Sequence, residues 1–295
     1  MQMITLMFRR GCKRSDKKRD AGLTTPEDVK RYDDIFYGPD RNHHVLDIYR
    51  PKDLTGKTPV IVSVHGGGWV YGDKELYQWY CMSLAQRGFA VVNFTYRLAP
   101  RFKYPAGIED TNTVFEWLIN NASEYGLDTN NIFAVGDSAG AHMLSVYCDI
   151  LSNPEYAKTY HLRIPENLHI NAVALNCGCY DAVLKAMDTT QNTAALMKDV
   201  LPHKGTKEEL EWISPINHVT KDFPPAYIMT SNEDFLKDQA PVMLEKLHAE
   251  GVTCESAFYG TEQEPLGHVF HLDMRSEVAH KCNDAECAFF RKYIK

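Results

Sequence analysis

The stretch Ile132-Phe133-Ala134-Val135-Gly136-Asp137-Ser138-Ala139-Gly140 decides the fold that we expect for this chain of 295 residues. Its apolar run predicts a short buried strand, and the residues beyond Gly140 have the spacing of a helix. A serine between two glycines at such a junction is typical of a nucleophile elbow, a sharp turn that exposes a serine hydroxyl at the top of a sheet. The same pattern also occurs in ordinary glycine-flanked turns, so the rest of the chain has to decide between the two interpretations.

Composition places the chain among globular proteins, with 44% hydrophobic and 24% charged residues. This usage suits one large α/β domain over residues 1–295. The formal net charge of −7 excludes an overall basic field, so we expect no binding to nucleic acid. No stretch approaches the roughly 20 apolar residues of a membrane span, so we expect no integral membrane association. Eight scattered cysteines favour a reduced, cytoplasmic protein.

Residues 1–30 predict a polar, helical lead-in that contributes to a small cap, and Thr24-Thr25-Pro26-Glu27 resembles a helix start. A basic run follows a short apolar stretch there, the reverse of the order in a secretory signal. The run consists of Arg9, Arg10, Lys13, Arg14, Lys17, Lys18 and Arg19. We interpret it as a solvated helix face or a frayed tail, with a peripheral membrane or partner contact as the alternative.

Alternating strand and helix patterns fill most of the remaining chain. Residues 34–37 and 44–49 predict an antiparallel hairpin at a sheet edge. The later runs that predict strands are 60–64, 89–94, 132–135, 170–175, 226–230 and 254–259. The helical patterns among them include 75–87, 238–249 and 277–293. Such alternation predicts a mostly parallel sheet of about eight strands with right-handed crossovers and helices on both faces.

Residues 180–217 interrupt this alternation with short helical pieces. In open α/β sheets, ligands bind beyond the carboxyl ends of the strands, where such an insertion lies. We therefore expect the insertion to form the second part of the cap. A plain surface insertion is the alternative.

A glycine loop, His65-Gly66-Gly67-Gly68-Trp69, follows directly after the strand predicted at 60–64. Glycines leave their N–H groups accessible, so these groups can converge on one negatively charged oxygen. A merely flexible loop is the alternative. We expect His65 to shape the loop through a hydrogen bond. We expect Trp69 and Tyr71 to line the substrate cleft, although simple packing would place aromatic residues there as well.

A serine hydroxyl attacks only when a base takes its proton, and an acidic group must hold that base in the right tautomer. In hydrolase sheets the acid and then the histidine follow the serine in chain order, on loops after later strands. Asp234 follows the strand predicted to end at Thr230, and His268 lies in the loop after the strand predicted to end at Tyr259. The weaker candidates are Glu233, Asp238, His271 and His280.

Five motifs together resemble the hormone-sensitive-lipase-like carboxylesterases of the α/β-hydrolase superfamily. They are His65-Gly66-Gly67-Gly68-Trp69, Tyr96-Arg97-Leu98-Ala99-Pro100, Gly136-Asp137-Ser138-Ala139-Gly140, Asp234-Phe235-Leu236-Lys237-Asp238 and His268-Val269-Phe270. Residues 46–51 are also similar to a neighbouring group that includes feruloyl and acetyl-sugar esterases and arylformamidases. The likeness runs from about residue 34 to the end of the chain.

The resemblance implies that Ser138 attacks an ester carbonyl, that His268 acts as base and then acid, and that Asp234 orients His268. It also implies an oxyanion hole from the N–H groups of Gly66, Gly67 and Ala139. It implies no metal and no organic cofactor.

Two departures from the family pattern, Arg101 after the Leu-Ala-Pro string and Ala141-His142 after the elbow, leave the acyl and alcohol preference open. We expect a small, soluble ester as the small-molecule substrate, of short acyl length or an acetylated or feruloylated sugar, and a homodimer remains an alternative. An arylformamidase-like amidase, a peptidase or a non-catalytic ligand receptor are the other functions that this scaffold allows.

Overall fold

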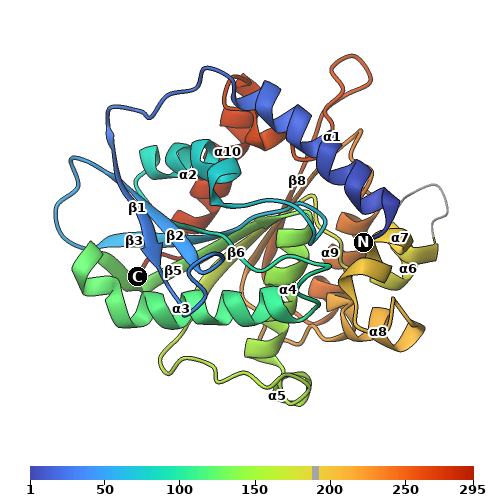
Figure 1. Ribbon diagram of the computed structural model, residues 1–295. Coiled ribbons are helices and arrows are strands. Elements are labelled where there is room, and N and C mark those ends of the chain that lie inside the picture. Colours follow the sequence, from blue (N-terminus) through green and yellow to red (C-terminus); the bar gives the residue numbers. More distant parts are fainter. Residues whose placement is uncertain (188–192) are drawn as a thin grey trace.

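The computed structural model describes residues 1–187 and 193–295, and an eight-stranded sheet runs through the centre of this part of the chain (Figure 1). The strand order is β1-β2-β4-β3-β5-β6-β7-β8. The strands are β1 (Val29–Phe36), β2 (Val45–Pro51), β3 (Thr58–Val64), β4 (Ala90–Phe94), β5 (Leu127–Asp137), β6 (Ile170–Asn176), β7 (Ala226–Ser231) and β8 (Cys254–Tyr259). The hairpin β1–β2 is antiparallel and lies at one edge, as predicted, and β3 to β8 run parallel.

The central strands are buried on both faces, as their β-branched sequences predict. On β3, Val60 and Val62 face one hydrophobic cluster and Ile61 faces the other. Neighbouring β5 alternates in the same way, with Ala134 and Phe133 on opposite faces. The parallel sheet therefore forms the middle layer of the molecule, and its carboxyl ends all open on one side.

Helices cover both faces of the sheet (Figure 1). The helices are α1 (Met3–Asp20), α2 (Lys74–Gln86), α3 (Ala106–Tyr125), α4 (Ala139–Ser152), α5 (Pro154–Ala157), α6 (Ala182–Met187), α7 (Thr193–Val200), α8 (Lys207–Trp212), α9 (Gln239–Ala249) and α10 (Glu277–Arg291), with 3-10 turns η1 (Pro215–Asn217) and η2 (Phe270–Leu272). Apolar side chains of α3, α4 and α9 belong to one cluster, and those of α2 and α10 belong to the other.

Some boundaries differ from the predictions. Strand β5 begins at Leu127 rather than at Ile132, because its first residues pair with β3 before an irregularity in the register. The helix start predicted at residues 24–27 is wrong. Pro26 accepts a hydrogen bond from the N–H of Val29, and the chain turns there directly into β1.

The segments predicted to form a cap, which we call the cap below, are α1 and the helices α6, α7 and α8 of the 180–217 insertion; residues 188–192 lie outside the described residues. Thr5 Oγ1 donates to Asp199 Oδ2 at 2.7 Å, which fixes the amino end of α1 on α7. None of the described helices is long and apolar enough to cross a membrane. All eight cysteines are free thiols, and the cytoplasmic location stays a prediction.

Candidate active site

Ser138 lies at the tip of the turn between β5 and α4, as the elbow pattern predicts. Its backbone has φ 52° and ψ −117°, a conformation in which few residues with a side chain are found. The two flanking glycines permit this turn. A Cβ on Gly136 would lie 2.6 Å from the carbonyl carbon of Gly140, and a Cβ on Gly140 would overlap the carbonyl oxygen of Val64. The glycines are therefore a steric requirement of the elbow.

Asp234 and His268 form a hydrogen-bonded pair beside the elbow. His268 Nδ1 donates to Asp234 Oδ1 at 2.6 Å, and the N–H of Leu236 donates to the same oxygen at 2.8 Å. Thr230 Oγ1 donates to Asp234 Oδ2 at 2.8 Å. Burial alone would raise the pKa of Asp234, but these hydrogen bonds and the nearby imidazole hold this pKa below its usual value. The carboxylate is therefore ionised and fixes the Nδ1–H tautomer of His268.

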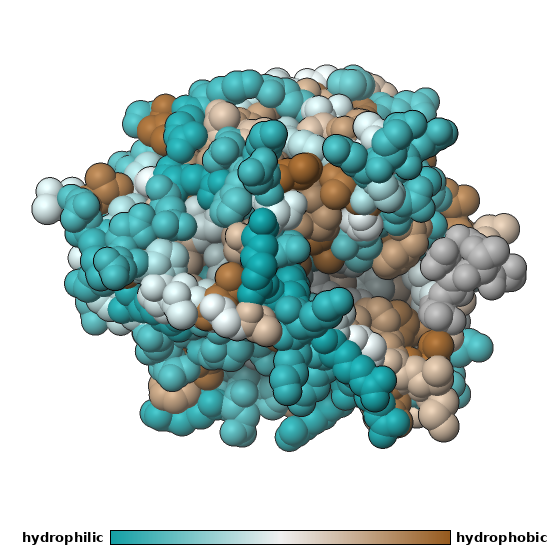
Figure 2. Space-filling view, turned by 90° about the horizontal axis from the view of Figure 1, so that it is seen from above, coloured by the Kyte–Doolittle hydropathy of each residue, from teal (hydrophilic) through white to brown (hydrophobic). Residues whose placement is uncertain are grey.

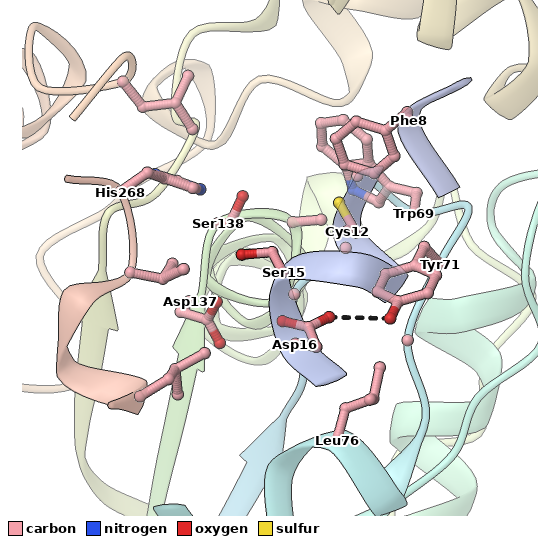
Figure 3. A pocket seen from close by; sticks show the side chains of 18 of the residues that line it. Phe8, Cys12, Ser15, Asp16, Trp69, Tyr71, Leu76, Asp137, Ser138 and His268 are labelled. Atoms are coloured by element: carbon pink, nitrogen blue, oxygen red, sulfur yellow. Dashed lines mark hydrogen bonds between the residues drawn. The ribbon is translucent and has the colours of Figure 1, made fainter. Parts of the chain in front are cut away.

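Figure 3 shows the ring nitrogen of His268 directed toward the hydroxyl of Ser138 across the cavity. With Nδ1 donating to Asp234, the other ring nitrogen, Nε2, is the one that remains free to accept the serine proton. The structure thus brings together the serine, the histidine and the aspartate that sequence reasoning selected.

The weaker candidates lie elsewhere. Glu233 is exposed, and Asp238 pairs with Lys185. His271 is fully buried in a site that lowers its pKa to about 3, and its ring does not line the cavity. His280 lies on α10.

The N–H of Gly66 is not free to bind an oxyanion, contrary to our expectation. This N–H donates to the hydroxyl of Tyr77 at 2.8 Å, and that hydroxyl donates to Asp137 Oδ2, also at 2.8 Å. This backbone donor is already used inside the protein, which argues against Gly66 as an oxyanion donor. Tyr77 instead ties the glycine loop to Asp137, the residue before Ser138. This connection could not be predicted from the sequence, because Tyr77 resembles any inward-facing residue of a helix.

The N–H groups of Gly67, Gly68 and Ala139 have no hydrogen-bond partner within residues 1–187 and 193–295. All three residues line the cavity that contains Ser138. His65 takes the structural position predicted for it. Its Nδ1 lies 2.7 Å from the carbonyl oxygen of Gly66, and its ring stacks on Tyr96.

The cavity has a volume of about 390 Å³ and is bounded by the elbow, the glycine loop, His268 and the cap. Trp69 and Tyr71 line it, as expected. Trp69 Nε1 donates to His142 Nδ1 at 3.1 Å, and Tyr71 donates to Asp16 at 2.8 Å. The pocket side of α1, which sequence reasoning did not assign, is formed by Phe8, Cys12, Ser15, Asp16 and Arg19. Their helical spacing was the only available signal.

Cys177 has its sulfur within 4.8 Å of ligand-type atoms of Asp234 and His268. Burial raises the pKa of this thiol well above its usual value. Asp234 and His268 already bind each other, so we assign this cluster to the serine site and not to a metal.

A buried carboxyl group lies beneath the elbow. Glu286 accepts hydrogen bonds from Tyr80 at 2.8 Å and from Asn176 Nδ2 at 2.6 Å. The carbonyl oxygen of Asn176 in turn accepts the N–H of Ser138 at 2.9 Å. Burial raises the pKa of Glu286 to about 7, and burial likewise raises the pKa of Asp137 to about 6.

Comparison with known proteins places this chain in a family. The BD-FAE family profile matches residues 46–246, more than half of the chain. Esterase LipC of Mycobacterium tuberculosis is 29% identical over 224 residues, which cover 73% of this chain and 54% of LipC. Versiconal hemiacetal acetate esterase of Dothistroma septosporum is 29% identical over 226 residues, which cover 72% of this chain and 67% of that protein.

Solved structures agree with the fold. A crystal structure of Esterase B from Lactobacillus rhamnosis, described as inhibited with a C4-C4 SN3 tributyrin phosphonate, superposes with a TM-score of 0.88 at 25% identity. The match covers 99% of this chain and 96% of that chain, whereas this chain spans about half the length of LipC. The chain therefore belongs to the BD-FAE family and is an α/β-hydrolase.

Proposed function

We propose that the protein is a serine carboxylesterase that hydrolyses small carboxylic esters through an acyl-enzyme on Ser138. The observation that carries the proposal is the His268–Asp234 pair, joined at 2.6 Å, which faces the elbow serine across a cavity (Figure 3). The relatives named as esterases support it.

In the proposed reaction, His268 Nε2 takes the proton of Ser138 while the serine oxygen attacks the ester carbonyl. His268 then gives this proton to the departing alcohol oxygen, and an acyl-enzyme remains. Water repeats the sequence on the acyl-enzyme and releases the acid. Asp234 stabilises the imidazolium that forms in both halves, because its carboxylate is already ionised and bound to Nδ1.

We assign the oxyanion hole to the N–H groups of Gly67, Gly68 and Ala139. Two observations support this set. Among the described residues these N–H groups have no hydrogen-bond partner and their residues line the cavity, whereas the N–H of Gly66 already donates to the hydroxyl of Tyr77. Ala139 also stands at the amino end of α4, where the helix dipole favours negative charge. In this proposal Gly66 anchors the glycine loop through Tyr77 and does not bind the oxyanion.

The cavity suggests the substrate class. Its volume of about 390 Å³ and an apolar wall from Phe8, Trp69 and Leu196 suit a short to medium acyl chain or a small aromatic acyl group. The acetate in the name of one relative and the tributyrin phosphonate described with Esterase B agree with a short acyl group. Acetylated or feruloylated sugars remain a narrower form of the same proposal.

The alternative is an amidase with the same three groups, since this chemistry serves both esters and amides. Hydrolysis of p-nitrophenyl esters of increasing acyl length, N-formylkynurenine, peptide anilides and acetylated sugars separates the two. We expect the highest kcat/KM on a short acyl ester. A clear preference for an amide would overturn the esterase assignment, and inactivity on every substrate would favour a ligand receptor.

A further inference from the structure

Helix α1 has two chemically different faces. The inner face lines the cavity with Phe8, Cys12, Ser15, Asp16 and Arg19 (Figure 3). A different side of the helix carries five exposed basic residues: Arg10, Lys13, Arg14, Lys17 and Lys18. The 3.6-residue period separates the two sets along the whole helix.

The charges of α1 are sorted between these faces. Both acidic residues, Asp16 and Asp20, are bound by Arg19 at 3.0 Å and 2.7 Å. In the part of the chain that the structure describes, the five outward cations form no ion pair or hydrogen bond. A chain with a net charge of −7 thus concentrates unpaired positive charge on one helix of its cap.

Exposed apolar side chains lie beside this basic face. Met3 and Met7, on the first two turns of α1, are 71% and 61% exposed. Leu184 and Met187 of α6 are also exposed, and Phe235 lines the cavity while remaining 44% exposed, so it lies at the rim. Exposed large apolar residues that gather in one region indicate an interaction surface.

Packing of the cap brings these residues to one side of the molecule. The amino end of α1 is fixed on α7 through Thr5 and Asp199, and Lys185 of α6 donates to the carbonyl oxygen of Phe235 at 3.2 Å. Figure 1 shows the amino end of α1 beside α6 and α7. Figure 2 looks onto this side and shows hydrophobic residues in a hollow that hydrophilic side chains border.

We propose that this side of the cap docks on an anionic lipid surface, with the five cations of α1 at the headgroups and the exposed methionines inserted among them. Basic helix faces with neighbouring apolar residues bind such surfaces through charge attraction plus apolar burial.

A polyanion such as nucleic acid, or an acidic protein, is the competing partner for a basic helix. Neither partner explains why two exposed methionines, Met3 and Met7, share the helix face that carries the cations. Docking does not rest on the proposed esterase activity, because adsorption to a lipid surface is measured without hydrolysis.

Sedimentation with vesicles tests the proposal, using the full chain with Ser138→Ala so that no lipid is consumed. We expect strong binding to phosphatidylcholine vesicles that contain phosphatidylserine, weak binding to pure phosphatidylcholine, and loss of binding at high salt. Each Lys or Arg at such a surface strengthens binding about fivefold. The triple variant Arg10→Gln, Arg14→Gln, Lys17→Gln is therefore expected to weaken binding about 100-fold at low salt.

A matched control removes the same charge elsewhere. The variant Lys57→Gln, Lys158→Gln, Arg163→Gln changes three exposed cations outside the cap and is expected to bind like the parent. The variant Met3→Gln, Met7→Gln is expected to lose about tenfold in binding through apolar area alone.

Equal weakening by both charge variants, or equal binding to both kinds of vesicle, would overturn the proposal. So would heparin binding that exceeds vesicle binding and ignores the methionine change, since that result would indicate a polyanionic partner. Each surface variant is also made in the protein that retains Ser138. There, circular dichroism and hydrolysis of a dissolved ester check that the variant folds and keeps its basal activity.

Discussion

The catalytic layer and the cap are built by different means. Ser138, Asp234 and His268 follow β5, β7 and β8, whose backbones pair in a continuous parallel sheet. In the cap, α1 buries only Thr5, and side-chain contacts rather than strand pairing hold it in place. From this difference we infer that the sheet sets the geometry of the proposed catalytic groups, while the cap shapes the cavity wall and presents the proposed docking surface.

The largest expected effect concerns the residues that follow the strands of the sheet. Ser138→Ala removes the nucleophile, so turnover on a short ester should fall about 10⁴-fold or more while the fold is retained. Hydrolysis of p-nitrophenyl acetate measures the turnover, and thermal unfolding checks that the fold is retained. Retention of more than about a tenth of the activity would mean that another residue is the nucleophile.

The second effect concerns the buried carboxyl group under the elbow. Burial raises the pKa of Glu286 from 4.5 to about 7, so the folded state holds a proton that the unfolded state has lost. Its contribution to stability is full below pH 4.5 and is lost as the pH rises through about 7.

Glu286→Gln should abolish this loss of stability. As the pH rises from 4.5 to about 7, the free energy of unfolding of the variant should increase by about 3 kcal/mol relative to that of the parent. Urea unfolding below and above this window measures the difference. Burial also raises the pKa of Asp137. Asp137 is present in both proteins, so its contribution cancels when their stabilities are compared. A stability difference that does not change with pH would contradict the buried-carboxyl interpretation.

A third and smaller effect tests the support of the oxyanion loop. Tyr77→Phe removes the hydroxyl that accepts from Gly66 and donates to Asp137. We expect kcat to fall about tenfold with little change in KM, since a misplaced oxyanion donor weakens transition-state binding. Tyr37→Phe, which breaks another buried tyrosine hydrogen bond, to the carbonyl oxygen of Thr95, should leave kcat unchanged. Equal losses of kcat in the two variants would show that Tyr77 contributes to stability in general and does not position the oxyanion loop.

The smallest effect belongs to the cap. Phe8→Ala shortens one side chain of the cavity wall, so kcat/KM for a medium-chain ester should fall about threefold to tenfold through KM. Hydrolysis of the acetate, which is too short to contact this wall, should not change. A loss of the same size on both esters would show that the cap affects the chemistry as well as the substrate.

Sequence reasoning predicted the sheet-borne half well. Strand runs and glycine spacing are local signals, so the elbow at Ser138 and the loop positions of Asp234 and His268 could be read in chain order. The edge hairpin and the two-sided burial of β3 and β5 followed from the same local patterns.

Contacts between distant segments could not be read in this way. The N–H of Gly66 is used by Tyr77, a residue on another element, so the choice of oxyanion donors depends on how α2 packs. The pocket face of α1 was hidden for the same reason. It depends on Arg9, which donates to the carbonyl oxygens of Val70 and Ala99 at 2.6 Å and 2.7 Å and sets the rotation of the helix.

Covalent labelling tests the central claim most directly. The protein is incubated with a fluorophosphonate, and intact mass is followed by peptide mapping. The account predicts a single adduct on the peptide that contains Ser138, absent in Ser138→Ala and slowed when His268 is replaced. An adduct on another residue, or one that persists in Ser138→Ala, would contradict it.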